Sequence, residues 1–189
     1  MGLWPIFAAA LWASSAAAHK NYWNPGSGHL LSAYTIGADP ITSFYVGHLD
    51  PGEVDFYRVD LPQGLPVLFG LMAPQACPEF VPQLWIVGRT VAGDETAPFA
   101  VPTGFRATQV ENAWTLYRDY MVTGRLGPRI EVASGASESD YYFVVYAGET
   151  GGSYIGVRVG QHGFGGTDEG FQAVADFHRC QPPATPAAR

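Results

Sequence analysis

The sequence predicts an all-β domain, an antiparallel, jelly-roll-like β-sandwich with a short C-terminal helix. The chain of 189 residues is 47% hydrophobic and 14% aromatic, which is enough apolar material for a core. It contains 23 glycines and 15 prolines, as expected where tight turns join many strands. Short segments rich in β-branched and aromatic residues recur at close spacing between these turn signals.

The expected strands follow from hydrophobic periodicity. The segment VDFYRVDL alternates strictly, and we expect Tyr57, Val59 and Leu61 to point inward. The region 109–124 mixes β-forming residues with a helical spacing of aromatics, and a strand is favoured there. The region 89–105 has no clear period and predicts a long loop with a short extended piece. The remaining strands are expected at 42–49, 65–74, 82–88, 127–134, 139–148 and 151–160.

Two turns are expected to close β-hairpins. The segment DPGE at 50–53 has the type II preference, because proline fixes φ and the following glycine supplies a positive φ. This turn would join strands 42–49 and 54–61. The segment AGETGG would join strands 139–148 and 151–160 in the same way.

The two ends of the chain are expected to lie outside the folded domain. Residues 1–18 form an uncharged apolar run followed by small residues, which predicts a secretory signal peptide cleaved before His19. The run is short for a membrane span. The β-sandwich domain would then cover 19–180, with a disordered tail at 181–189. We therefore expect a secreted, extracellular protein with no transmembrane segment in the mature chain.

The pattern near the C-terminus changes from strand to helix. Thr167 can cap the start of a short helix, and acidic residues follow it in the first turn. The apolar face of this helix is expected to contain Phe171, Val174, Ala175 and His178.

Cys77 and Cys180 are the only cysteines. In an oxidising compartment an even pair predicts one disulfide. Two free buried thiols are the alternative, which the expected signal peptide disfavours.

The charge of the chain bears on its partners. The formal net charge is −7, so a polyanion would be repelled and nucleic-acid binding is not expected. Anionic membrane surfaces are disfavoured for the same reason.

The sequence contains residues for two candidate metal sites. Asp50, Glu53 and Asp55 lie within six residues and could supply oxygen ligands to calcium, although a solvated turn explains them without a metal. Cleavage after Ala18 would leave His19 at the terminus, where its amine and imidazole could chelate copper. A second histidine would have to complete this copper site, the candidates being His29, His48, His162 and His178.

Aromatic residues near the mature N-terminus provide a third candidate site. Tyr22 and Trp23 are the aromatics most expected to be exposed, and could stack against a sugar or a peptide. Most other large aromatics are expected to fill the core.

Two segments of the chain resemble the bacterial pre-peptidase C-terminal domain, a small β-sandwich appended to exported proteins. They read SFYVGHLDPGEVDFYRVDLPQG and DYYFVVYAGETGGSYIGVRV. The resemblance rests on Ser43, Gly47, Asp55, Tyr57, Gly64, Tyr141, Tyr142, Val144, Gly152 and Tyr154. It implies a binding or accessory role, sometimes linked to calcium, and not catalysis.

We therefore expect a secreted, non-catalytic binding or accessory module, whose partner is an extracellular protein or a glycan. One alternative is a copper-dependent oxidative enzyme using His19. The other is a carbohydrate-binding module. Bound metal would indicate the copper enzyme, and an exposed aromatic strip would indicate the carbohydrate-binding module.

Overall fold

The computed structural model describes residues 20–37, 41–59, 66–93, 96–118, 123–133, 141–161, 165–166 and 168–182. The expected signal peptide, His19 and most of the expected tail lie outside these residues. In chain order the elements are β1 (Lys20–Trp23), the 3₁₀ helix η1 (Leu30–Ser32), β2 (Tyr34–Ile36), β3 (Ser43–Leu49), β4 (Val54–Val59), β5 (Pro66–Pro74), β6 (Gln83–Gly88), β7 (Arg106–Gln109), β8 (Thr115–Arg118), β9 (Thr123–Ala133), β10 (Tyr141–Tyr146), β11 (Gly152–Val159), β12 (Gly165–Gly166) and α1 (Asp168–Phe177).

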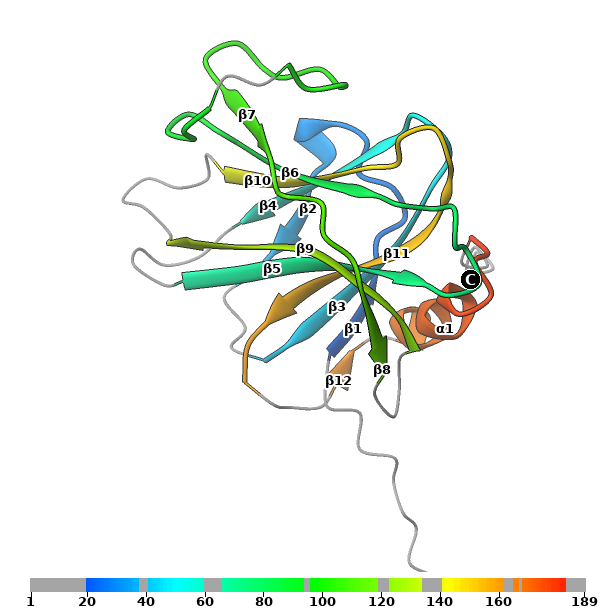
Figure 1. Cartoon of the computed structure of the whole chain (residues 1–189). Coiled ribbons are helices and arrows are strands. Elements are labelled where there is room, and N and C mark those ends of the chain that lie inside the picture. Colours follow the sequence, from blue (N-terminus) through cyan, green and yellow to red (C-terminus); the bar gives the residue numbers. More distant parts are fainter. Residues whose placement is uncertain are drawn as a thin grey trace, which may run out of the picture.

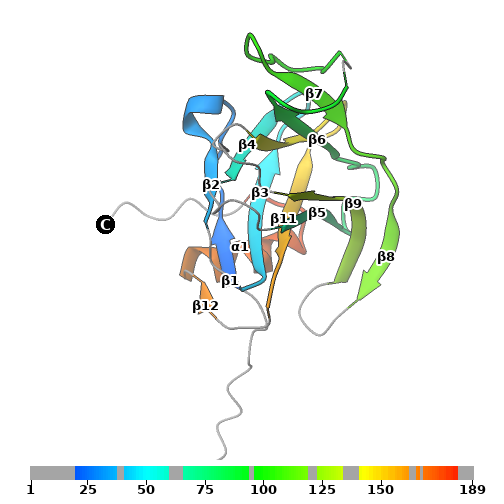
Figure 2. The ribbon, with the colours of Figure 1, turned by 90° about the vertical axis from the view of Figure 1, so that its left-hand side faces the viewer.

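The strands form two sheets packed as a sandwich, with one short C-terminal helix, which confirms the predicted fold class (Figure 1). The larger sheet has the order β12-β1-β3-β11-β5-β9-β8, and the smaller has the order β2-β4-β10-β6-β7. Figure 2 shows the larger sheet from the side, with its strands following one another from β1 to β8. Within the described residues, no helix is both long and apolar enough to cross a membrane.

The pairing is mixed rather than purely antiparallel. β1 runs parallel to β3 and to β12, and β2 runs parallel to β4. Neither β1 nor β2 was predicted from the sequence. Both are only three or four residues long, which is too short to show a hydrophobic period. Each forms by pairing with strands that follow it in the chain.

The two predicted hairpins are wrong, although their turns form. Glu53 N–H donates to the Asp50 carbonyl at 3.0 Å, and Gly52 has φ of 80°, as the type II preference requires. The turn nevertheless leads from β3 in the larger sheet to β4 in the smaller one, and β10 and β11 are divided in the same way. A turn sequence specifies the local bend, whereas the partner of each strand depends on which face it buries.

The core lies between the sheets and is rich in aromatic rings. Tyr57 is fully buried and Val59 is buried, so both point inward as predicted; Leu61 lies outside the described residues. Phe69 and Phe143 stack across the sandwich with ring centroids 4.6 Å apart. Gly47 leaves room for the Tyr154 ring, since a Cβ at this position would lie 2.5 Å from it.

The helix α1 covers part of the outer face of the larger sheet. Its buried residues include Gly170, Ala173, Val174 and Phe177, whereas Phe171 is 41% exposed. The predicted helix face is therefore rotated from the true one. Gly170 explains the difference, because the lack of a side chain lets the helix approach the backbone of Asn21 closely.

The predicted disulfide between Cys77 and Cys180 is present, with the two Cα atoms 5.8 Å apart. It connects the loop after β5 to the residues that follow α1. The crosslink closes a loop of 103 residues, for which the chain-entropy model gives a stabilisation of about 4–5 kcal/mol.

The long loop predicted at 89–105 contains no strand in its described part. The strand favoured at 109–124 is confirmed only over β8, because residues 110–114 form no strand. The loop folds over the outer face of the smaller sheet. There Phe99 packs edge-to-face against Phe56 and Trp85, with ring centroids 5.9 and 5.6 Å apart. The loop thus covers a sheet face that alternation alone would leave in solvent.

Candidate functional site

A buried carboxylate lies beneath one end of the sandwich. Successive side chains of β4 point to opposite faces of the sheet, so the side chains of Asp55 and Tyr57 both point inward. Asp55 is only 1% exposed. Around it are Asn24, Ser27, Tyr57 and Tyr154, and we call these five residues the Asp55 network.

Three donors satisfy the Asp55 carboxylate. The Ser27 backbone N–H and Oγ donate to Oδ1 at 2.6 and 3.0 Å, and the Tyr154 hydroxyl donates to Oδ2 at 2.6 Å. The Tyr57 and Tyr154 hydroxyls are 2.6 Å apart. Because the Tyr154 hydrogen points to Asp55, Tyr57 is the donor in that pair.

Asn24 completes the network from the segment after β1. Its Nδ2 donates to Ser27 Oγ at 2.9 Å and to the Tyr57 hydroxyl at 3.1 Å. The hydrogen bonds of the network therefore form chains of donors that end at the Asp55 carboxylate. This directional order connects β4 of the smaller sheet with β11 of the larger sheet and with the segment at 24–27.

Burial sets the protonation of the network. Desolvation raises the pKa of Asp55 above its ordinary value, while the hydrogen bonds from Tyr154 and Ser27 oppose this rise. Desolvation raises the pKa of Tyr57 and of Tyr154 well above the ordinary value, so both remain protonated donors. Most hydrogen bonds of these five residues join members of the network, and Asn24 Oδ1 also accepts from the Gly26 N–H at 3.2 Å, so the network acts as a structural element.

The three acids predicted for calcium do not converge. Asp55 points into the sandwich, and Asp50 is exposed. Glu53 Oε2 accepts a 2.9 Å hydrogen bond from the Asp50 backbone N–H, which stabilises the turn. In the described part of the chain, no group of three or more His, Cys, Asp or Glu side chains is placed to hold a metal ion. His19 and His162, proposed for copper, lie outside that part.

His48 has a defined tautomer. Ser153 Oγ donates to the Gln181 carbonyl at 2.9 Å, so its hydrogen is not available to the imidazole. His48 Nδ1, 2.9 Å from Ser153 Oγ, must then carry a hydrogen and donate it. Desolvation lowers the pKa of His48 below its ordinary value, against the opposing effect of Asp50 and Glu53. The neutral ring therefore has a lone pair on Nε2.

A polar recess of about 370 Å³ lies over this end of the sandwich. Its lining includes two histidines, three glycines, the exposed Glu53 and the strand residue Asp55, whose own side chain is buried. The residues are Gly26, Gly28, His29, His48, Leu49, Gly52, Glu53, Val54 and Asp55.

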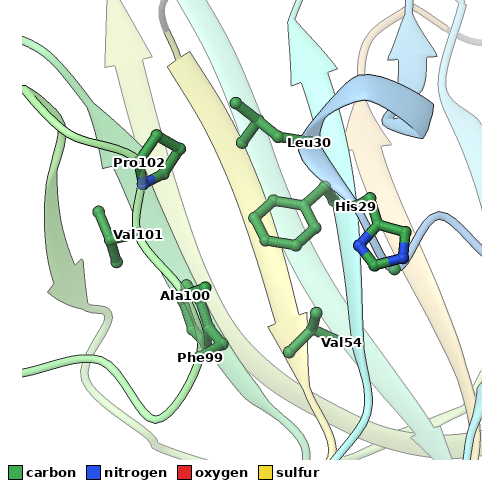
Figure 3. A pocket seen from close by; sticks show the side chains of 9 residues that line it. His29, Leu30, Val54, Phe99, Ala100, Val101 and Pro102 are labelled. Carbon is green, nitrogen blue, oxygen red and sulfur yellow. The ribbon is translucent and has the colours of Figure 1, made fainter.

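An apolar recess of about 250 Å³ adjoins it on the outer face of the smaller sheet. In Figure 3, Phe99, Ala100, Val101 and Pro102 form one side, while His29 and Leu30 lie opposite. The full lining is Gly28, His29, Leu30, Val54, Phe56, Phe99, Ala100, Val101 and Pro102. The two recesses share Gly28, His29 and Val54, and we call them together the His29 groove.

The predicted stacking pair does not form a common platform. Tyr22 stacks on Tyr45 with ring centroids 5.5 Å apart and packs against the core between the sheets. Trp23 packs against the cluster beneath α1, on the opposite face of the larger sheet. Neighbouring residues of a strand point to opposite faces, which separates the two rings.

Sequence reasoning missed the apolar residues of the groove, including Phe99 and Val101. It named His29 and His48 only as candidate copper ligands, and Glu53 only as a candidate calcium ligand. One signal was available for the buried acid: Asp55 precedes Tyr57 by two positions in an alternating strand, so an inward Tyr57 implies an inward Asp55. Neither a protein-family model nor a curated protein matches the chain. The resemblance to the pre-peptidase C-terminal domain therefore stays a prediction, and function has to be argued from the site.

Proposed function

We propose that the protein is a secreted, non-catalytic binding module whose ligand site is the His29 groove. The observation that supports this most directly is that an apolar and a polar recess share Gly28, His29 and Val54 in their linings. Binding sites typically combine a concave apolar surface with a few polar groups that orient the ligand. The groove has both parts, and Phe56 and Phe99 support its apolar part by edge-to-face packing.

The chemistry of the polar recess favours binding over catalysis. Ser153 is fully buried and gives its hydrogen to a backbone carbonyl, so the Ser153–His48 pair is not arranged as a nucleophile and its base. Asp55 is occupied by three donors, which leaves Glu53 as the accessible carboxylate of the groove. General acid–base catalysis by paired carboxylates is therefore not favoured.

A secreted location agrees with two separate features. The N-terminal residues have the pattern of a signal peptide. The disulfide between Cys77 and Cys180 is of a kind that persists in oxidising compartments.

A second apolar recess, of about 310 Å³, lies on the outer face of the larger sheet beside α1. Its lining is mainly aliphatic and aromatic, with Thr42, Tyr117 and Arg129 as its polar side chains. None of its lining residues is a carboxylate or a histidine, whereas the His29 groove contains Glu53 and two histidines, so we place the binding site in the groove.

Titration of the ¹⁵N-labelled protein, followed by NMR, tests the proposal. The ligands are a panel of oligosaccharides and short peptides. At least one class is expected to shift the resonances of residues 28–30, 53–54 and 99–102. Ala100 is exposed and lines the apolar recess, so Ala100→Trp should fill the recess and abolish these shifts while the fold persists. Shifts confined to the larger sheet, or chemical turnover of a ligand, would contradict the proposal.

A further inference from the structure

We infer that the His29 groove binds an extended basic peptide segment, in which a large aliphatic or aromatic residue lies one or two positions from a lysine or arginine. This inference rests on the proposed function and specifies its ligand. It follows from the size of the apolar recess, from the charge of the polar recess and from the way the two are joined.

The apolar recess has the size for a single side chain. Its volume of about 250 Å³ is below the range of roughly 300–1,000 Å³ that drug-sized ligands occupy. The large apolar side chains of its walls are Leu30, Val54, Phe56, Phe99 and Val101. A leucine or phenylalanine side chain would be enclosed by carbon on several sides, and the gain would come from the apolar surface removed from water.

The polar recess favours a positive charge. Among the described residues that line the groove, none is a lysine or arginine, whereas Glu53 is exposed at its rim. Asp50 is exposed on the same turn. The neutral ring of His48 adds an acceptor at Nε2. The formal charge of −7 would also draw a basic segment toward the protein.

The junction of the recesses explains why one ligand would occupy both. Glu53 and Val54 are consecutive in the chain, and Val54 lines both recesses. An extended chain advances by about 3.3 Å per residue, so a basic residue one or two positions from the apolar one would be near Glu53. Gly26, Gly28 and Gly52 are exposed and have no side chains, so a peptide can approach this surface closely.

The experiment uses a matched set of blocked hexapeptides, Gly-Ser-Leu-Z-Ser-Gly, acetylated and amidated at their ends. Z is Lys, Arg, Gln or Glu, and a second set replaces Leu by Ser. Dissociation constants come from NMR titration of the mature protein at low ionic strength. The Lys and Arg peptides are expected to bind about fivefold more tightly than the Gln peptide, with the Glu peptide weakest. The Leu-to-Ser set is expected to lose binding.

Two variants separate charge from general effects. Glu53→Gln should reduce the preference for Lys over Gln to near unity, while its side-chain oxygen can still accept from the Asp50 N–H. Glu149→Gln is the matched control, because Glu149 is exposed on the neighbouring turn and does not line the groove. It removes the same charge and should preserve the preference.

The outcomes distinguish the inference from the proposed function. Equal binding of Lys, Gln and Glu peptides in the groove would overturn the inference and leave the binding module intact. If oligosaccharides bound and Ala100→Trp blocked this binding, while no peptide bound, the inference would again be overturned and the binding module would remain supported. Failure of the entire panel to shift groove resonances would overturn both.

Discussion

The Tyr154 hydroxyl donates a 2.6 Å hydrogen bond to Asp55 Oδ2 and so connects the two sheets of the sandwich. Tyr154 belongs to β11 in the larger sheet and Asp55 to β4 in the smaller one. Both side chains are almost completely buried. Removal of either partner would leave a polar group without water, which is more costly than the bond itself.

Removal of single hydroxyl groups should therefore have unequal effects. Tyr154→Phe leaves Asp55 Oδ2 without its donor and Tyr57 without an acceptor, and should destabilise the fold by about 1–3 kcal/mol. Tyr57→Phe leaves every bond to Asp55 in place and should cost less. Urea unfolding of both variants, with unchanged m-values, checks this order. Equal losses of stability in the two variants would contradict the hydrogen-bond directions assigned to the network.

The pH dependence of stability should reveal Asp55. Its folded pKa is raised above the ordinary value of 3.8, so the folded state holds the proton more strongly than the unfolded state. Stability contributed by this group is present at low pH and is lost as pH rises from about 3.8 through the folded pKa. Asp55→Asn cannot titrate, so the wild-type stability should fall relative to this variant over that window. Urea unfolding at intervals from pH 3 to pH 7 measures the difference.

The opposite pH dependence would show that hydrogen bonding affects the pKa of Asp55 more strongly than desolvation does. Three donors to the carboxylate favour its ionised form, and if they prevailed, the wild type would gain stability relative to Asp55→Asn as pH rises. The experiment therefore decides which of the two effects prevails in the native protein.

His48 should produce the opposite slope at higher pH. Its folded pKa lies below the ordinary value of 6.5, so the unfolded state binds more protons in the window between them. Stability should rise with pH through that window and level off above about 6.5. His48→Asn is the control, since its Nδ2 can replace Nδ1 as donor to Ser153 but cannot titrate. A difference between wild type and His48→Asn that does not vary with pH would contradict the lowered pKa of His48.

Local pattern determined much of this protein. Strict alternation placed Tyr57 and Val59 in the core, because a strand turns successive side chains to opposite faces. The proline and glycine of the 50–53 turn specified its bend through their own dihedral preferences. The cysteine pair was predictable from its number alone, since two cysteines have a single intramolecular pairing.

Only the tertiary structure decided what depends on partners far apart in the chain. Asp55 meets Ser27 and Tyr154, which are 28 and 99 residues away, and no local pattern encodes those contacts. The division of β3 and β4 between sheets follows from their pairing with β11 and β10, rather than from the turn that joins them. The His29 groove likewise exists because the loop at 96–105 packs opposite η1 over Phe56. Short-range dihedral preferences therefore gave the strands and turns, while burial against distant residues produced the buried acid and the groove.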